Sequence, residues 1–404
     1  MNNIIKKYSN LYASPYLVGI FMWVNAIKDI ALFVDWPDCN FFRADMIYKT
    51  HDLFSTLKDS SINTRLYFSW VMPNKMVLWY NDKIKRKIWF IEKNNNFKLW
   101  VITNMPVTSL LGIQYDWIIQ DFKKQYLIVK SYTDKFRIDG YSLFLREIAK
   151  KIDLNINKKK KRYSISIIWY LFDRNEWDTL WNLKEFKRLL TLIWVEINTI
   201  WLNWWKFDEL KKVEESELLV VLPYGHHAWK VLKRKLNVDI LELDIPFGLK
   251  NTINFVKQIW EKLWLNSNKV KRIINEEINK IKNKIDLLDN RRFLVKNYIY
   301  AWDPFLESWI KDIWELLWMN HIKTYKYTWD NFFRKEDIWN QKIDLVVWNS
   351  DFNINNDNVV KIEFWFPSYN THYLTNRPFM WFEWLLNFIE RLYNELWKKG
   401  IIYN

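Results

Sequence analysis

Three side chains that are close together in the sequence could bind a metal. Cys39 is the one cysteine of the chain, and it follows the turn V-D-W-P-D where a helix is expected to begin. A helix N-terminus lowers the pKa of a thiol and favours the thiolate, which is the form that binds iron. Asp35 and Asp38 lie beside it and could supply oxygen ligands. The alternatives are an inert buried cysteine and two aspartates that form the turn or cap the helix.

Histidine and arginine mark two further places. His226 and His227 follow V-V-L-P-Y-G and open a predicted helix. Adjacent helical residues point about 100° apart, so we do not expect this pair to bind one metal ion. His226 is instead predicted to line a ligand cleft or to begin the helix. His372 and Arg377 lie in the last loop before the C-terminal helix, where they are expected to contact an anionic ligand or to be ordinary surface residues.

Alternating strands and helices must position these side chains. Strands are predicted at 30–34, 99–103, 126–130, 163–168, 195–201, 217–222, 238–243, 293–299, 322–327, 343–347 and 359–364. Helices are predicted at 39–57, 108–124, 139–152, 178–193, 206–214, 226–236, 267–290, 304–318 and 379–398. This alternation favours parallel sheets with right-handed crossovers. We therefore predict an α/β protein of three doubly wound, Rossmann-like domains around a central cleft, at residues 1–157, 163–266 and 267–404, with ligands at the carboxyl ends of strands.

Tryptophan stands where glycine is normally required. The chain has 28 Trp and only 6 Gly, and the two types together approach the ordinary glycine share of about 7%. Trp36, Trp302 and Trp348 follow β-branched runs, and Trp194 lies where a helix usually ends with a left-handed glycine. We predict that most of these residues are glycine in the cell, through a genetic code in which UGA specifies glycine. Trp201, inside a strand-like run, is a candidate for a genuine tryptophan, and the alternative is a truly Trp-rich protein.

The composition is that of a globular protein, with 50% hydrophobic and 26% charged residues. The net charge of +15 could indicate nucleic-acid binding. However, the Lys-rich composition fits AT-rich coding, and the basic run at 158–162 is expected to be a solvated linker, so no nucleic-acid partner is predicted. The early apolar stretch at 16–27 is too short to span a bilayer, and no signal peptide is visible. We therefore expect a cytoplasmic protein without membrane association.

Segments in the right order along nearly the whole chain resemble component 1 of nitrogenase and its relatives, which include dark-operative protochlorophyllide reductase subunits and cofactor-maturation scaffolds. Residues 14–43 are similar to the family's small-residue helix, strand and His-Gly-Pro-x-Gly-Cys turn, with Trp36 standing for Gly and with Asp35 and Asp38 replacing His and Gly. M-V-L-W-Y-N-D-K-I and T-S-L-L-G-I-Q-Y-D resemble V-x-G-G-x-x-K-L and E-x-I-G-D-D. The segment R-P-F-M-W-F-E-W resembles R-x-P-x-x-Gly-[YF]-x-Gly.

The resemblance implies an oxidoreductase subunit that accepts low-potential electrons from a separate ATP-driven iron–sulfur reductase. It also implies an iron–sulfur cluster at the interface with a homologous subunit, with Cys39 and Asp38 among its ligands. A four-iron cluster usually takes four ligands, so the homologous subunit would supply the others. In one reductase branch of the family an Asp supplies a cluster ligand. His372 and Arg377 would face a tetrapyrrole-like ligand or a cofactor. No P-loop is present, so the chain is not expected to hydrolyse ATP itself.

Two positions depart from the family pattern and argue against one of the family's reactions. No cysteine lies near Asn104–Pro106, where the family has a later cluster ligand, and Met380 takes the place of the cofactor histidine. We therefore do not expect dinitrogen reduction. The alternative is a non-catalytic scaffold or cofactor-binding protein of the same fold that has lost the cluster. Whether the partner subunit is identical to this chain or a different homologue stays open.

Overall fold

The computed structural model describes most of the chain as two compact units. Unit 1 comprises residues 1–175 and 197–240, and unit 2 comprises residues 176–196 and 241–404. The described residues are 16–36, 50–57, 64–71, 80–105, 108, 112–130, 137–168, 174–202, 206–287, 296–302, 310–312, 315, 317, 319–326, 342–348, 350, 358–364, 368–378 and 380–399. Among them, no helix is both long and apolar enough to cross a bilayer.

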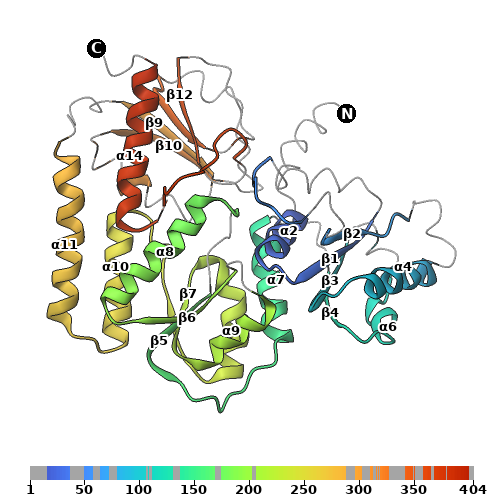
Figure 1. Cartoon of the computed structure of the whole chain (residues 1–404). Coiled ribbons are helices and arrows are strands. Elements are labelled where there is room, and N and C mark those ends of the chain that lie inside the picture. The colour runs from blue at the N-terminus through green and yellow to red at the C-terminus, as the bar shows by residue number, and fades with distance from the viewer. Residues whose placement is uncertain are drawn as a thin grey trace. The chain divides into compact units, whose positions relative to one another are not determined.

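The first sheet of unit 1 has the strand order β2-β1-β3-β4 (Figure 1). Its strands are β1 (Ile30–Asp35), β2 (Leu66–Phe68), β3 (Leu99–Asn104) and β4 (Gln125–Val129), and the pairings β1–β2, β1–β3 and β3–β4 are parallel. The helices around this sheet are α2 (Tyr16–Ala26), α4 (Tyr80–Asn94), α6 (Tyr115–Ile119) and α7 (Arg137–Lys151). All residues of β1 are buried, as expected for a parallel strand that is covered on both faces.

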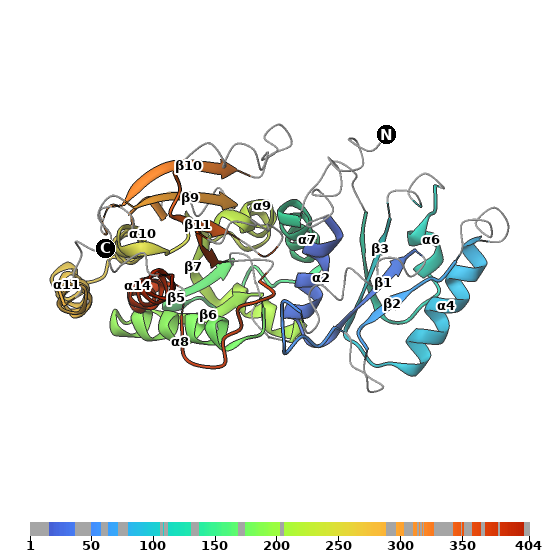
Figure 2. The ribbon, with the colours of Figure 1, turned by 90° about the horizontal axis from the view of Figure 1, so that it is seen from above.

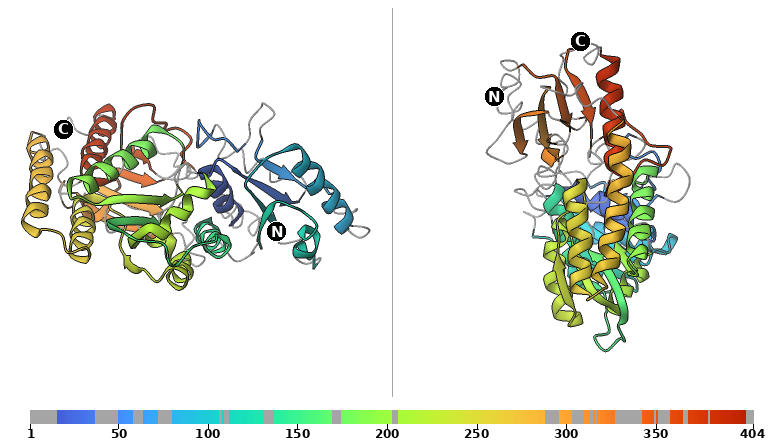
Figure 3. Two further views of the ribbon diagram at one scale, coloured as in Figure 1. Left: turned by 60° about the horizontal axis from the view of Figure 1, so that its bottom comes forward. Right: turned by 90° about the vertical axis from the view of Figure 1, so that its left-hand side faces the viewer.

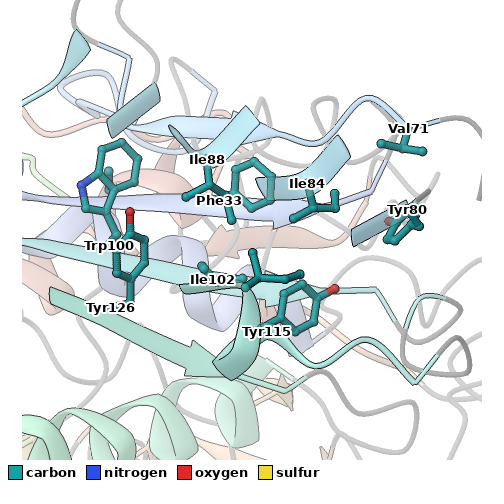
Figure 4. Close-up of a cluster of buried hydrophobic side chains, with 11 residues drawn as sticks. Phe33, Val71, Tyr80, Ile84, Ile88, Trp100, Ile102, Tyr115 and Tyr126 are labelled. Carbon is teal, nitrogen blue, oxygen red and sulfur yellow. The ribbon is translucent and has the colours of Figure 1, made fainter. Parts of the chain in front are cut away.

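The helices of this sheet lie in two layers (Figure 2). On one face, α4 and α6 place Ile84, Ile88 and Ile118 against Phe33 and Ile102 of the strands (Figure 4). On the other face, α2 packs against β1 and α7 packs against β4. The layers leave the carboxyl ends of β1, β2 and β3 together at one edge, which is where an open parallel sheet places its ligand site.

The second sheet has the order β6-β5-β7-β8. Its strands are β5 (Lys161–Ile168), β6 (Glu196–Trp201), β7 (Ser216–Val221) and β8 (Asp239–Glu242), with the 3-10 helix η3 (Phe207–Glu215) and the helix α9 (His226–Leu236) between them. The basic run expected to be a linker ends in β5, where Lys161 forms an ion pair with Glu215 at 3.0 Å. The segment predicted as a helix at 206–214 is a 3-10 helix. It ends directly before β7, and 3-10 helices commonly serve as such short connections.

The third sheet lies in unit 2 and has the order β10-β9-β11-β12. Its strands are β9 (Asn297–Trp302), β10 (Asn320–Lys326), β11 (Leu345–Trp348) and β12 (Val360–Glu363), and the pairings of β9 with β10 and β11 are parallel. Four helices accompany it: α8 (Trp177–Leu192), α10 (Gly248–Lys262), α11 (Ser267–Ile285) and α14 (Trp381–Lys398). Figure 3 shows α10 and α11, in yellow and gold, side by side. Three four-stranded sheets confirm the predicted α/β, doubly wound fold class.

Among the described residues, four tryptophans have a left-handed backbone. Their φ angles are 53° at Trp70, 60° at Trp194, 54° at Trp264 and 72° at Trp381. Trp194 follows α8, where the Val195 N–H donates to the Leu190 carbonyl at 2.9 Å. Trp264 follows α10, where the Leu265 N–H donates to the Trp260 carbonyl at 3.1 Å. Both ends are Schellman motifs, whose left-handed position is usually glycine.

Candidate functional site

The carboxyl edge of the first sheet holds a buried carboxylate. Asp35 is the last residue of β1 and is fully buried. Its Oδ1 accepts a hydrogen bond from the Tyr80 hydroxyl at 2.5 Å, and its Oδ2 accepts one from the Tyr115 hydroxyl. Tyr80 begins α4 and Tyr115 begins α6, and Figure 4 shows both rings at the same end of the core. Three elements that are distant in the sequence therefore meet at one carboxylate.

The electrostatics of this carboxylate are set mainly by burial. Burial raises the pKa of Asp35, and the hydrogen bonds from Tyr115, Tyr80 and Ser69 act in the opposite direction. Burial and the neighbouring carboxylate also raise the pKa of Tyr80 and of Tyr115. Both hydroxyls therefore remain protonated donors, and the carboxylate is stabilised mainly by neutral groups, with a weaker attraction from Lys87.

Other polar side chains line the same edge of the sheet. Thr108 donates its hydroxyl to the Asp35 carbonyl at 3.3 Å, and the Ser69 N–H donates to the Val34 carbonyl at 3.1 Å. Ser69, Thr108 and Asn104, the last residue of β3, are all buried. Cys39 and Asp38 lie outside the described residues. Of the three residues predicted around the turn, the structure therefore places only Asp35.

A second buried polar cluster in unit 1 was not anticipated from the sequence. The Oδ2 of Asp52 accepts hydrogen bonds from the amides of Asn25, at 2.8 Å, and Asn175, at 2.6 Å. Nearby, the guanidinium of Arg65 donates to the carbonyls of Val24, at 2.5 Å, and Ile27, at 2.7 Å. Burial lowers the pKa of Arg65 to about 10. These contacts close the C-terminal end of α2, and no sequence motif joins their residues.

His372 of unit 2 is held by a buried glutamate. Its Nδ1 lies 2.7 Å from the Oε1 of Glu176, which is fully buried and precedes α8. The other oxygen of Glu176 accepts from the Tyr373 N–H at 2.8 Å. The side chain of His372 is 24% exposed. Glu176 therefore fixes the orientation of an imidazole whose ring is still partly open to solvent.

The remaining predicted residues are placed separately. Arg377 lies 3.4 Å from Glu390 of α14, and both side chains are exposed. His226 is the first residue of α9, as predicted. Met380, which the sequence resemblance matches to the family's cofactor histidine, is buried, and its N–H donates to the Asn182 side chain at 2.9 Å. The described residues contain no group of three or more His, Cys, Asp or Glu arranged to hold a metal ion.

Comparisons with known proteins give one family match and a likeness of fold. A sequence model described as "Nitrogenase component 1 type Oxidoreductase" matches residues 51–299. A search of curated proteins finds no match. Among solved structures, "Nitrogenase Cp1 at pH 6.5" superposes with a TM-score of 0.77 at 16% identity, covering 96% of this chain and 93% of that chain. "Nitrogenase Cp1 at pH 5" gives a TM-score of 0.71 at 12% identity, covering 96% and 89%. At these identities, the structural matches show likeness of fold.

Proposed function

The chain belongs to the nitrogenase component 1 type oxidoreductases, and from this premise we propose that it is the electron-accepting subunit of a nitrogenase-like enzyme. Its electron donor is a separate ATP-driven iron–sulfur reductase, and its partner is a homologous subunit. The reaction is a low-potential reduction other than that of dinitrogen, because the positions that would hold the nitrogenase cofactor carry no Cys or His. The enzyme acts in the cytoplasm.

The observation that carries this proposal is the extent of the likeness. The family match covers β2 to β8 and reaches the start of β9, and the fold likeness covers 96% of the chain. A short shared motif could arise in an unrelated doubly wound protein, but three parallel sheets in one chain, with family signatures in order, could not easily do so.

The proposed cluster site is the turn that follows β1. Cys39 supplies a thiolate and Asp38 an oxygen ligand, and the partner subunit completes the ligand set, since this chain has a single cysteine. An iron–sulfur cluster bound there would store and pass on single electrons. The buried polar edge formed by Asp35, Ser69 and Thr108 supports this assignment, because Asp35 ends β1 four residues before Cys39 in the sequence.

In keeping with the sequence prediction, we assign His372 and Arg377 of unit 2 to ligand contacts, and separately His226, the first residue of α9 in unit 1. His372 would contact a ligand through Nε2, because Glu176 occupies its Nδ1. Arg377 would have to leave Glu390 to bind an anion, and this exchange has a low cost because exposed ion pairs contribute about 0–1 kcal/mol.

We also propose that the gene is read with UGA as glycine. The left-handed backbone of Trp194 and Trp264 supports this proposal, since an L-residue pays roughly 1–2 kcal/mol in that conformation and glycine pays none. Trp264 is 91% exposed, so its ring gains no burial that would offset this cost. Trp302 and Trp348 are the last residues of β9 and β11, as predicted for strand ends.

Electron transfer is the direct test of the proposed function. The protein is purified without oxygen together with its partner subunit and mixed with a P-loop iron–sulfur reductase from the same organism. We expect the reductase to be oxidised when ATP is present, and its absorption spectrum monitors this oxidation. With a non-hydrolysable ATP analogue we expect no oxidation of the reductase. Binding of the reductase without electron transfer would favour the scaffold function instead.

A further inference from the structure

We propose that Glu176 and His372 form an acid–base pair, in which the buried carboxylate holds the imidazole in the tautomer with its proton on Nδ1. Nε2 is then the nitrogen that exchanges a proton with a ligand. Glu176 is a positioning residue, because it acts through His372. The inference rests on the proposed function for the ligand contact of His372, but the pair itself is a feature of unit 2.

The hydrogen bonds of Glu176 indicate where the shared proton lies. Its Oε1 is 2.7 Å from the Nδ1 of His372, and its Oε2 accepts from the Tyr373 N–H at 2.8 Å. Glu176 is fully buried, and a buried carboxylate is stabilised by such donors. A carboxylic acid gives up its proton more readily than an imidazolium does. The proton therefore resides on Nδ1, and Nε2 of the neutral ring carries the lone pair.

The segment 368–373, which carries the imidazole, is also held by side chains of neighbouring elements. Glu363, the last residue of β12, accepts from the Asn370 N–H at 3.1 Å. Arg391 of α14 donates to the Thr371 hydroxyl at 2.9 Å and to the Tyr373 hydroxyl at 2.7 Å. The ring of His372 is therefore fixed in place as well as in tautomer, beyond the carboxyl end of a parallel strand.

The open side of the ring determines which ligands the pair can take. The side chain of His372 is 24% exposed, and no side chain in the described part of the chain bonds its Nε2. A lone pair at this position accepts a proton or a hydrogen bond from an O–H or N–H group, and the protonated ring returns the proton. The pair therefore fits a ligand that gains or loses a proton at the contacted atom, as a substrate does when reduction adds hydrogen to it.

Nitrogen NMR of isotopically labelled histidine tests the tautomer in the full-length protein, purified with its partner. The chain has five histidines, and the signals of His372 are those lost in His372→Gln. At alkaline pH we expect the Nδ1–H tautomer in the wild type. Glu176→Gln should shift the ring toward the Nε2–H tautomer, because an amide offers one oxygen to the two donors that the carboxylate now binds.

Acylation by diethyl pyrocarbonate, mapped by peptide mass spectrometry, measures access to the Nε2 lone pair. We expect His372 to react, and Glu176→Gln to slow its acylation roughly tenfold, as for other histidines that lose an orienting partner. The matched control is Glu363→Gln, which removes a carboxylate that holds the same segment through Tyr369 and Asn370. This control should keep the wild-type tautomer and the wild-type acylation rate.

Two results would overturn the pair. One is an Nε2–H tautomer in the wild type, which would place the shared proton on Glu176. The other is an equal loss of reactivity in Glu176→Gln and Glu363→Gln, which would show that Glu176 only anchors the segment. Should Glu176→Gln not fold, the wild-type tautomer decides alone. Neither measurement needs iron or electron transfer, so failure of the pair and failure of the proposed function are seen separately.

Discussion

Single tryptophan residues divide into two groups in this structure. Trp23 and Trp201 are buried, and their indole N–H groups donate to the carbonyls of Tyr141, at 3.0 Å, and Leu210, at 3.2 Å. Trp194 and Trp264 have left-handed backbones and exposed rings. Trp381 is buried and left-handed, and its indole N–H has no acceptor among the described residues. Under the recoding proposal, a tryptophan with a bonded indole is expected to be genuine, and a tryptophan with a left-handed backbone is expected to be glycine.

Peptide mass spectrometry of the native protein tests this division. We expect glycine at 70, 194, 264 and 381 and tryptophan at 23 and 201, because the first four have positive φ and the last two have a bonded indole. Each glycine that stands in place of a tryptophan lowers the mass of its peptide by the mass difference between the two residues. Tryptophan at all six positions, encoded by UGG, would contradict the recoding proposal.

Stability measurements on protein made with tryptophan at these positions test the same residues independently. Trp264→Gly and Trp194→Gly should each raise the free energy of unfolding by about 1 kcal/mol, because glycine adopts the left-handed conformation without strain. Trp201→Gly is the control and should lower it by about 3–5 kcal/mol, since it removes a buried side chain. Urea denaturation measures all three, and a stability loss in Trp264→Gly would show that its ring contributes packing.

The elements differ in how well the sequence predicts them. β1, β3, β5 and β7 were predicted closely, because each contains a short, mostly apolar run that is buried. The helix α4 was missed because its apolar residues are spaced among lysines, and β2 was missed because it has three residues. The segment at 39–57 was predicted to be helical, but its described part at 50–57 forms turns.

The candidate site shows why residue contacts are harder to predict than elements. Asp35 was identified from its place beside Cys39, but its partners lie 45 and 80 residues away in the chain. Glu176 and His372 are likewise 196 residues apart. Only the fold brings these residues together, and neither pair leaves a spacing that a single sequence could reveal.

An ion-pair cluster links the helices α8 and α11, and its charges make the stability of this contact depend on pH. Arg188 bonds the buried Glu277 at 2.5 Å. Burial alone would raise the pKa of Glu277, but hydrogen bonds from Arg188 and Lys280 outweigh it and hold the pKa below 4.5. A lowered pKa stabilises the fold above pH 4.5, and this contribution is lost as the pH falls through the folded-state pKa.

The variant Glu277→Gln should therefore lower the free energy of unfolding by roughly 1–2 kcal/mol at pH 7, a figure reduced because Arg188 is partly exposed. The gap to wild type should close as the pH falls from about 4.5 towards the lower folded-state pKa, because the unfolded chain protonates Glu277 first and the folded protein follows at lower pH. Denaturant titrations across pH 3–7 provide the measurement. A gap that widens at low pH would show that the pKa is not lowered by the cluster.

The whole chain combines a family fold with a reduced set of metal ligands. Three parallel sheets and a match over residues 51–299 place it among the nitrogenase component 1 type oxidoreductases. Because the chain has a single cysteine, the proposed four-iron cluster would need ligands from a partner chain. On this proposal the oligomer, and not the isolated chain, is the unit of function.

Iron counting on the intact complex tests this account most directly. The protein and its partner are purified without oxygen, and iron per chain and the visible spectrum are measured for wild type and for Cys39→Ala. We predict a coloured complex with stoichiometric iron and broad visible absorption, both lost in the variant while the subunits remain associated. A colourless, iron-free wild-type complex, or one whose iron persists in Cys39→Ala, would contradict the account.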